Sequence, residues 1–568
     1  MNSHPNTRIQ AAVRRSFTFL SLGFATFLAA LAACDATSDP DTFDTGGGGP
    51  GGEGPVSGTG ALGIGGMGGG TLAVGSGGTT GQVCKVSDTT PDALPPCKDK
   101  APADSFTPEV QWSWTAPPNA NAYSGSIVTP LVGNFTDDNK DGSIDLCDIP
   151  DVLVTVFEDF PLPGTPGSIY MLAGDTGALE LTFQAKVDPN ITPAFGDIDG
   201  DGLPDVVAAT PDGHLIAFEH DGKVKWIGPD VGGWTTTMNS YCTSIALYDL
   251  EGDGQVEIIA AFEVFDAQGK RKWGIPGNCA EFPAAAYWCP TATAADLDGD
   301  GKLEVLFGHA TYHSDGTLMW QVPGNPGHPH VANLDDDPEP EIFLTQDTGI
   351  SVIEANGTVK FGPIRPTDPN ISANCWGKPG VIHDFDGDGK ADIATGSCSD
   401  YSVYKVTGTA IPSWTAAVSD MSGLATGTAF DFLGDGVADA IYADEHNAYV
   451  FEGKSGAVEL TTPRGSGTLV EYPVVVDVDN DGSAEIVVVS NWGWFGEVPG
   501  ATVTVIKDAQ DRWIQARRIW NQHAYHVTNV REDGVIPKKM AKSWTLLNTF
   551  RTNSQIEGSG DCAPETPK

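Results

Sequence analysis

Residues 195–209 read FGDIDGDGLPDVVAA. Within this stretch Asp197, Asp199, Asp201 and Asp205 place oxygen ligands at positions 1, 3, 5 and 9 of a loop, and position 6 is a glycine, where a chain that wraps around an ion has to turn sharply. Closely spaced hard oxygen donors, without histidine or cysteine among them, favour calcium over a transition metal. The apolar run that follows position 9 has the length and composition of a buried β-strand.

The same pattern occurs eight times, and its first positions recur at intervals of about 49 residues. In the fifth copy Asn333 stands at position 1 and Pro338 replaces the glycine, and in the seventh copy Leu433 stands where a ligand belongs. We expect these two sites to bind calcium more weakly. The predicted calcium ligands are Asp137, Asn139, Asp141 and Asp145; Asp197, Asp199, Asp201 and Asp205; Asp249, Glu251, Asp253 and Glu257; Asp296, Asp298, Asp300 and Glu304; Asn333, Asp335, Asp337 and Glu341; Asp384, Asp386, Asp388 and Asp392; Asp431, Asp435 and Asp439; and Asp477, Asp479, Asp481 and Glu485.

The flanks of these loops distinguish them from EF-hands. An EF-hand needs an acid at position 12, whereas Ala208 and Phe307 stand there in the second and fourth copies. A Gly-x-x-x-aromatic hairpin follows several copies, for example Gly222 to Trp226. Each unit is therefore predicted to contain four strands, with the loop between the first two. Four strands at this period are typical of a β-propeller blade, so we expect an all-β propeller of eight blades, with seven as the alternative, and a calcium loop in each blade.

The chain at this point resembles the FG-GAP or VCBS-type repeat family, as found in the head of integrin α chains. The stretch 195–202 carries the resemblance best, and the resemblance extends over roughly 111–520. It implies propeller blades with a D-x-D-x-D-G calcium loop between their first two strands.

The N-terminus has the features of a bacterial lipoprotein signal. Three arginines precede an apolar run from Phe17 to Ala33, and Cys34 follows small residues at the place of the acylated cysteine. An ordinary cleaved secretory signal is the alternative. We divide the chain into a signal peptide (1–34), a glycine-rich tether (35–83), a cysteine-containing segment (84–110), the propeller (111–520) and a basic C-terminal closing element (521–568). A lipid anchor at Cys34 would place the protein in the cell envelope, on the extracytoplasmic side of a membrane.

The composition limits the partners. The chain has 75 Asp and Glu against 31 Lys and Arg, a formal net charge of −44, which makes nucleic acid an unfavourable partner. Outside the cytoplasm disulfides persist, and the short separations suggest the pairs Cys84 with Cys97, Cys279 with Cys289 and Cys375 with Cys398.

Catalytic motifs are not evident in the sequence. It contains no G-x-S-x-G and no H-E-x-x-H pattern, and Gly453-Lys454-Ser455 lies in a predicted hairpin turn rather than a phosphate-binding loop. We expect His330, His383 and His446 to be solvated or to lie behind the metal ligands. Four tryptophans recur at one place in the blade, where packing between blades is favoured over sugar stacking: Trp226, Trp273, Trp320 and Trp414.

A basic segment interrupts the acidic chain. Between Arg512 and Arg551 eight basic residues stand against two acids. We interpret this segment as an element that docks on the acidic propeller and closes the ring, with a site for an anionic glycan or a metal at His523 and His526 as the alternative. The stretch 111–114 is expected to pair with a strand near 512–514 in one composite blade.

These observations lead to a functional hypothesis: a calcium-stabilised cell-envelope lipoprotein for binding or adhesion, which recognises a glycan or protein ligand. A polysaccharide lyase or hydrolase on the same propeller is the first alternative, and a passive structural protein of the envelope is the second.

Overall fold

The computed structural model describes residues 100–102, 105–117, 124–157, 165–228, 243–275, 291–367, 375–420, 425–492 and 500–556. All of them belong to one compact unit, Thr79–Lys568. The signal peptide, Cys34, the tether and the two predicted cysteine pairs at 84/97 and 279/289 lie outside the described residues.

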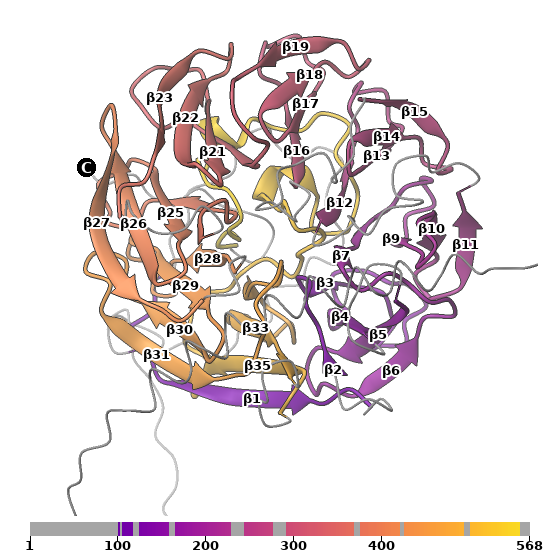
Figure 1. The fold of residues 1–568 in the computed structure, drawn as a ribbon. Helices are drawn as coiled ribbons and strands as arrows, with labels where there is room; N and C mark the ends of the chain where they lie inside the picture. Colours follow the sequence, from indigo (N-terminus) through magenta and orange to yellow (C-terminus); the bar gives the residue numbers. More distant parts are fainter. Residues whose placement is uncertain are drawn as a thin grey trace, which may run out of the picture. The chain divides into compact units, whose positions relative to one another are not determined.

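The described strands form eight sheets arranged as the blades of a propeller (Figure 1). In the first seven blades the chain runs from the innermost strand outward through antiparallel neighbours, as the four-strand unit predicted, whereas the outermost strand of the eighth blade is the N-terminal β1. The strands of the first four blades are β3 (Leu131–Gly133), β4 (Asp151–Phe157), β5 (Gly167–Ala173) and β6 (Leu179–Thr182); β8 (Ala194–Gly196), β9 (Asp205–Ala209), β10 (Leu215–Phe218) and β11 (Val224–Ile227); β12 (Thr243–Tyr248), β13 (Glu257–Ala260), β14 (Glu263–Phe265) and β15 (Arg271–Gly274), with β7 (Ile191–Thr192) added beside β12; and β16 (Ala292–Ala295), β17 (Glu304–Phe307), β18 (Ala310–Tyr312) and β19 (Leu318–Gln321).

The second half of the ring repeats this order. Its strands are β20 (His328–Ala332), β21 (Glu341–Gln346), β22 (Gly349–Glu354) and β23 (Val359–Ile364); β24 (Val381–His383), β25 (Asp392–Gly396), β26 (Asp400–Val406) and β27 (Ala410–Ala417); β28 (Gly427–Phe430), β29 (Asp439–Ala443), β30 (Asn447–Phe451) and β31 (Val458–Pro463); and β32 (Val474–Val476), β33 (Glu485–Val489), β35 (Val503–Asp508) and β1 (Pro108–Trp114). A separate two-stranded sheet joins β2 (Ser124–Gly125) to β34 (Asn491–Trp492).

Burial follows the position of a strand in its blade. The second strands, such as β9 and β33, are buried at every residue, whereas outermost strands such as β6 and β11 are partly exposed. This pattern explains why the runs after the acidic loops are continuously apolar: both faces of those strands pack against neighbouring blades. The helical elements in the described ranges are two 3-10 turns, η3 (Val527–Asn529) and η4 (Ser543–Thr545), and no described helix has the length and apolar character needed to cross a membrane.

The ring is closed by a composite blade. The N-terminal strand β1 pairs antiparallel with β35, from Pro108 opposite Asp508 to Trp114 opposite Val503. The composite blade expected from the sequence is therefore present, but the predicted partner strand near 512–514 was wrong. After β35 the chain turns inward, and Trp513 packs on Phe432, with ring centroids 4.5 Å apart.

Tryptophans on the outermost strands contact the next blade by hydrogen bonds and packing. The indole Nε1 of Trp273 donates to Ser314 O in the next blade at 2.7 Å, and Trp320 and Trp414 make the equivalent bonds to Ala355 O and Gly453 O. A Cβ added at Gly269 would lie 2.5 Å from the Trp226 ring, so Trp226 packs on the next blade as well. The predicted packing between blades is thus confirmed.

The C-terminal segment, defined here as residues 513–556, lies inside the ring (Figure 1, yellow). It contacts the innermost strand of every blade, or the loop that follows that strand. Around the ring, the contacts join Trp520 to Val132, Asn521 to Phe195, Gln522 to Leu247, Lys542 to Asp296, Asn548 to Asn333, Phe550 to Ile382, Arg551 to Thr428 and Asn553 to Val475. The basic segment therefore ties all eight blades together at the centre.

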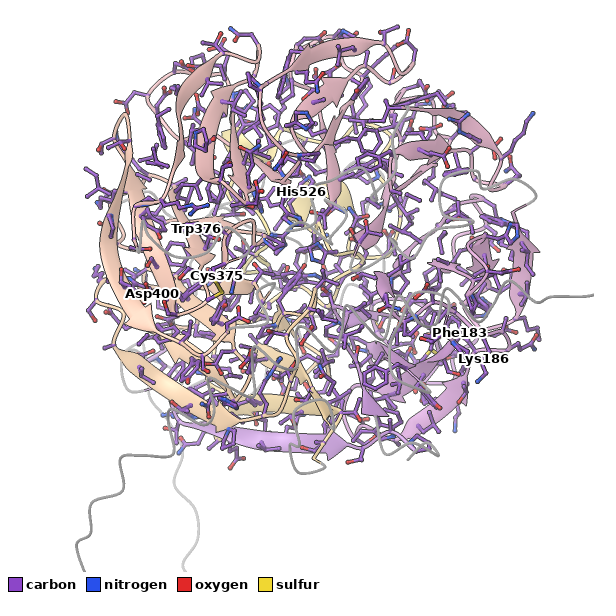
Figure 2. The ribbon with its side chains drawn as sticks, in the orientation of Figure 1. Phe183, Lys186, Cys375, Trp376, Asp400 and His526 are labelled. Atoms are coloured by element: carbon purple, nitrogen blue, oxygen red, sulfur yellow. A yellow bond between two sulfur atoms is a disulfide. The ribbon has the colours of Figure 1, made fainter. Side chains whose placement is uncertain are left out.

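One predicted disulfide is confirmed. Cys375 and Cys398 are bonded, with Cα atoms 4.8 Å apart (Figure 2), and they link the entry to the sixth blade with the turn after β25. Cys147 is disulfide-bonded as well.

Candidate functional site

The acidic loops lie between the innermost strand and the second strand of each blade. In blades 2 to 8 the acid at position 9 is the first residue of the second strand and is buried there. These residues are Asp205, Glu257, Glu304, Glu341, Asp392, Asp439 and Glu485.

Hydrogen bonds within each loop turn the carboxylates inward. In the second blade, Asp197 accepts from Gly200 N at 2.6 Å through one oxygen and from Gly202 N at 3.0 Å through the other. Gly202 has φ +87°, a conformation that residues with a side chain rarely adopt. Asp249 in the third blade accepts from Asp253 N and Gly254 N in the same way. The loops therefore hold their position 1 acid in a fixed orientation.

In several loops the predicted ligands lie close enough together to bind one ion. Their carboxylate oxygens lie within 4.8 Å of one another. The converging groups include Asp197, Asp199 and Asp205; Asp296, Asp298 and Asp300; Asp335, Asp337 and Glu341; and Asp384, Asp386 and Asp392. The fifth copy thus brings three acids together despite Asn333 and Pro338, while Asn333 itself bonds to the C-terminal segment through Asn548.

The seventh and eighth loops keep the same internal bonding. Asp431 accepts from Asp435 N and Gly436 N, although Leu433 supplies no ligand between them. In the eighth loop Asp477 accepts from Asp481 N and Gly482 N and is fully buried. Burial raises the pKa of Asp477 to about 8, and the negative charge of Asp481 adds to this increase.

The donor set fits a hard divalent cation. The oxygens Asp205 Oδ2, Asp392 Oδ2 and Glu485 Oε1 are buried and have no hydrogen-bond partner. Burial raises the pKa of Asp205 and of Asp392 to about 7. Buried carboxylate oxygens without partners are costly, and a cation among them would supply the missing interaction.

Lysines that were not among the predicted site residues face several of these loops from the outer strands. Lys225 Nζ lies 2.6 Å from Asp199 Oδ2 and 3.0 Å from Asp205 Oδ1. Lys272 and Lys360 contact the position 9 acids of blades 3 and 5 at 2.8 and 3.0 Å. Each of these lysines directly precedes the aromatic residue of the Gly-x-x-x-aromatic hairpin, a regularity in the sequence that could have revealed them.

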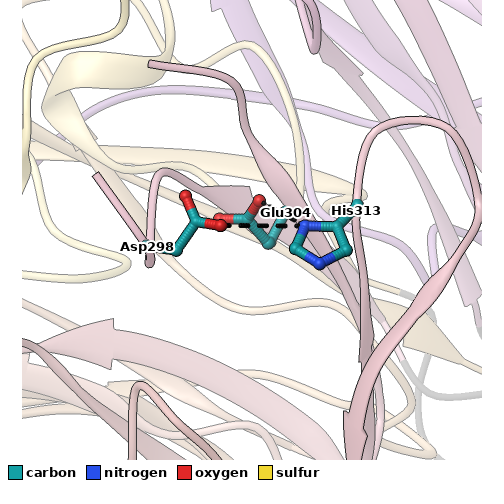
Figure 3. A group of neighbouring side chains, drawn as sticks. All are labelled: Asp298, Glu304 and His313. Carbon is teal, nitrogen blue, oxygen red and sulfur yellow. Dashed lines mark hydrogen bonds and ion pairs between the residues drawn. The ribbon is translucent and has the colours of Figure 1, made fainter. Parts of the chain in front are cut away.

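The fourth blade has a histidine in this role. His313 Nδ1 lies 3.2 Å from Glu304 Oε1 and 3.9 Å from Asp298 Oδ2 (Figure 3). In the sixth blade Lys405, on β26, lies 2.7 Å from Asp388 Oδ2 and also pairs with Asp386. The charge facing the acids therefore differs from blade to blade.

The first loop departs from the predicted register. Asp145 was expected at position 9, but the second strand of this blade begins at Asp151, which accepts from Phe135 N at 2.8 Å, just as Glu257 accepts from Leu250 N. An insertion accounts for the shift. Within it Asp148, fully buried, accepts from Asn139 N and Asp145 N. The signal that could have identified Asp151 is the apolar run directly after it.

The centre of the ring is closed. His328, His330, His523, His526 and Arg551 are buried there, with His526 in the middle of the ring (Figure 2). Arg551 donates to Gly380 O at 2.6 Å and to His523 O at 3.2 Å. Desolvation lowers the pKa of His328 to about 3 and of His526 to about 4, so both are neutral.

Two expectations about histidines are corrected by this arrangement. His330 was expected to be solvated or behind metal ligands, but it accepts from Gly380 N in the buried centre. His526 stacks on Phe550 with centroids 5.4 Å apart, and both His523 and His526 are buried, so neither side chain is exposed to an anionic glycan in solution. The alternative of a metal held by these two histidines stays a prediction. His446 is exposed, and His383 bonds to Asp384 N.

Comparisons with known proteins agree with this architecture. The model of the FG-GAP-like repeat family matches residues 197–260 and 431–488. No curated protein matches the sequence. Among solved structures, the V. cholerae biofilm matrix protein Bap1 is similar with a TM-score of 0.69 and 21% identity, over 81% of this chain and 100% of that chain.

Two enzymes are similar with lower scores. A Bacillus licheniformis rhamnogalacturonan lyase has a TM-score of 0.46 and 16% identity over 80% of each chain. A quinohemoprotein alcohol dehydrogenase from Comamonas testosteroni has a TM-score of 0.46 and 12% identity, over 79% of this chain and 83% of that chain. The matched repeats and the eight sheets together identify this protein as an eight-bladed β-propeller with FG-GAP-like repeats.

Proposed function

We propose that this protein is a calcium-stabilised propeller of the cell envelope that binds a glycan or protein ligand. The observation that carries the proposal is the closed centre of the ring. A general acid or base has to come within hydrogen-bond reach of a substrate. His330, His523 and Arg551 are fully buried by the C-terminal segment, so the groups best suited to such chemistry face no solvent. A role in binding is favoured over catalysis.

Calcium is the cation we propose for the acidic loops. The partnerless oxygens of Asp205, Asp392 and Glu485 and the convergence of position 1, 3 and 9 acids support it. In the loops whose acids converge, the side chains at positions 1, 3, 5 and 9 would hold the ion. When bound, calcium supplies positive charge that allows buried carboxylates to stay ionised. Its role would be to fix the turn between the first and second strands of each blade.

Exposed apolar side chains occur on the outermost strands of the blades. The large apolar side chains that are exposed among the described residues all lie on these strands. They stand singly or in pairs on seven of the eight outermost strands and so do not mark one binding patch. They are Val110, Leu179, Val224, Ile227, Leu318, Val359, Ile411 and Val458.

The envelope location rests on the N-terminal sequence. We propose that Cys34 is acylated and that residues 35–83 tether the propeller to a membrane. Mass spectrometry of the mature N-terminus tests this assignment. An acylated Cys34 supports it, and an unmodified mature N-terminus at another residue contradicts it.

A binding screen tests the function. The purified protein is applied to a glycan array and to envelope extracts, in calcium and in chelator, and the same glycans are incubated with it and assayed for unsaturated or hydrolysed products. We expect the protein to bind a ligand more weakly in chelator than in calcium, and we expect no unsaturated or hydrolysed product. Depolymerisation of a polysaccharide would favour the lyase or hydrolase alternative, and failure to bind any ligand would favour a passive structural role. Bap1, to which the fold is similar, is a biofilm matrix protein, and an adhesive role here is compatible with that likeness.

A further inference from the structure

The fourth blade lacks the lysine that contacts the position 9 acid in blades 2, 3 and 5. Lys225, Lys272 and Lys360 occupy the position before the aromatic residue on the outermost strands of blades 2, 3 and 5 and contact the position 9 acid. In the fourth blade this position is Met319, and the imidazole of His313 approaches the acids from the turn after β18. The fourth blade therefore combines nitrogen and oxygen donors where blades 2, 3 and 5 have carboxylates and an ammonium group.

The three donors of this group have the spacing of ligands on one ion. His313 Nδ1 lies 3.2 Å from Glu304 Oε1 and 3.9 Å from Asp298 Oδ2, and all three atoms lie within 4.8 Å of one another (Figure 3). Ligands at about 2.0–2.2 Å from a zinc ion lie about 3–4 Å apart. Glu304 is 1% exposed, and its other oxygen accepts from Leu297 N at 2.8 Å. This bond directs Oε1 toward His313.

A cavity of about 500 Å³ adjoins the group. Asp298 and Met319 line it from the fourth blade, and Asp337, Glu339 and Glu354 line it from the fifth. Of the three donors, Asp298 borders this cavity, and the surrounding carboxylates would concentrate cations there. The cavity therefore reaches the group from the side of Asp298, whose side chain is exposed.

We propose that Asp298, Glu304 and His313 form a site for a divalent transition metal of the zinc class. Imidazole is a ligand that suits zinc, copper and nickel, whereas calcium takes oxygen ligands. Three protein ligands with one open position are a common arrangement for zinc. Because Asp298 and Glu304 also belong to the proposed calcium loop, the two ions compete in this blade. The inference rests on the proposed cation binding by these loops and assigns a different ion to one of them.

The test is a metal titration of the full chain in excess calcium. Zinc affinity is measured by competition with a chromophoric chelator, and cobalt(II) is used as a spectroscopic probe of its coordination. We expect one tight zinc site that persists in calcium and that gives visible cobalt bands. Loss of an outer-sphere partner commonly costs a metal site 10–100-fold in affinity, so removal of a direct ligand in His313→Ala is expected to weaken zinc binding at least about tenfold.

Two further variants complete the test. His313→Lys reproduces the lysine contact of blades 2, 3 and 5, and we expect it to abolish zinc binding while keeping the fold. His446→Ala removes an exposed histidine in the seventh blade and should leave zinc affinity unchanged. Unchanged zinc affinity in both His313 variants, or displacement of zinc by calcium at equal concentration, would overturn the proposal. These results would contradict the zinc proposal alone. The calcium proposal is contradicted by a different result, a wild-type melting temperature that chelation leaves unchanged.

Discussion

Gln111 donates a hydrogen bond from its Nε2 to Asp479 Oδ2 at 2.6 Å, although 368 residues separate the two. Gln111 lies on β1, and Asp479 belongs to the acidic loop of the eighth blade. From the C-terminal segment, Gln515 donates to Asp477 Oδ2 in the same loop at 3.0 Å. This loop is therefore the point where the first strand, the last blade and the C-terminal segment meet, so its charge state is coupled to ring closure.

Substitution of Trp112 tests closure directly. Trp112 is buried on β1, and its Nε1 donates to Gly174 O in the first blade at 2.6 Å. We expect Trp112→Ala to lower the free energy of unfolding by about 3–5 kcal/mol, because it leaves a cavity and an unpaired carbonyl between two blades. Chemical denaturation measures the loss. The exposed neighbour Ser113→Ala serves as the control and should change little, and equal midpoints for the two variants would speak against the closing role of β1.

Removal of Arg551 tests the central contacts. Arg551→Met leaves the carbonyls of Gly380 and His523 without their donor in a fully buried environment. Each such group costs about 1–3 kcal/mol, so for the two carbonyls we expect a loss of about 2–6 kcal/mol in the free energy of unfolding. The exposed Lys539→Met in the same segment is the matched control. A variant as stable as the control would show that the C-terminal segment contributes little to the ring.

The ammonium group of Lys225 is expected to supply part of the stabilisation that a bound calcium ion would give to the second acidic loop. Lys225→Met leaves Asp199, Asp205 and Glu219 without their ammonium partner. In chelator we expect a destabilisation of about 1–2 kcal/mol, which calcium restores. Melting in both conditions measures it. The control is Lys223→Met, which removes an exposed ion pair with Asp221. If Lys225→Met lowers stability in chelator and calcium does not restore it, Lys225 and calcium do not act on the same acids.

The repeated loops predicted much of the fold because strands and tight turns are encoded locally. The run after Asp205 predicted a buried strand, and β9 begins at Asp205. The pairing of Cys375 with Cys398 and the packing of Trp226 between blades also followed from short-range spacing. Eight copies of one unit were enough to predict a propeller.

Contacts between distant residues could not be predicted in this way. The contact of Arg551 with Gly380 depends on the path of the C-terminal segment through the ring, which no periodicity encodes. The insertion that moves the strand-starting acid from Asp145 to Asp151 breaks the repeat locally. His313 lies outside the loop motif and reaches Glu304 only because β17 and β18 form a hairpin.

The dependence of stability on pH should differ between the calcium-bound and the calcium-free protein. Burial raises the pKa of Asp205 and Asp392 to about 7, above the value of 3.8 for an unburied Asp. Without calcium, folding favours their protonated form, so this stability is present at low pH and is lost as pH rises through about 7. Each group contributes at most about 1.4 kcal/mol per pH unit. Calcium takes the place of the protons, so the difference in melting temperature between calcium and chelator should be larger at pH 8 than at pH 5. An equal difference at both pH values would contradict the assignment of these acids.

Thermal melting of the whole protein at pH 8, in calcium and in chelator, shows whether calcium in the acidic loops stabilises the propeller. An ion that binds only the folded state at ten times its Kd stabilises it by about 1.4 kcal/mol per site, so several loops together contribute several kcal/mol. We expect chelation to lower the melting temperature sharply and added calcium to restore it. A melting temperature that is the same in calcium and in chelator would contradict this expectation.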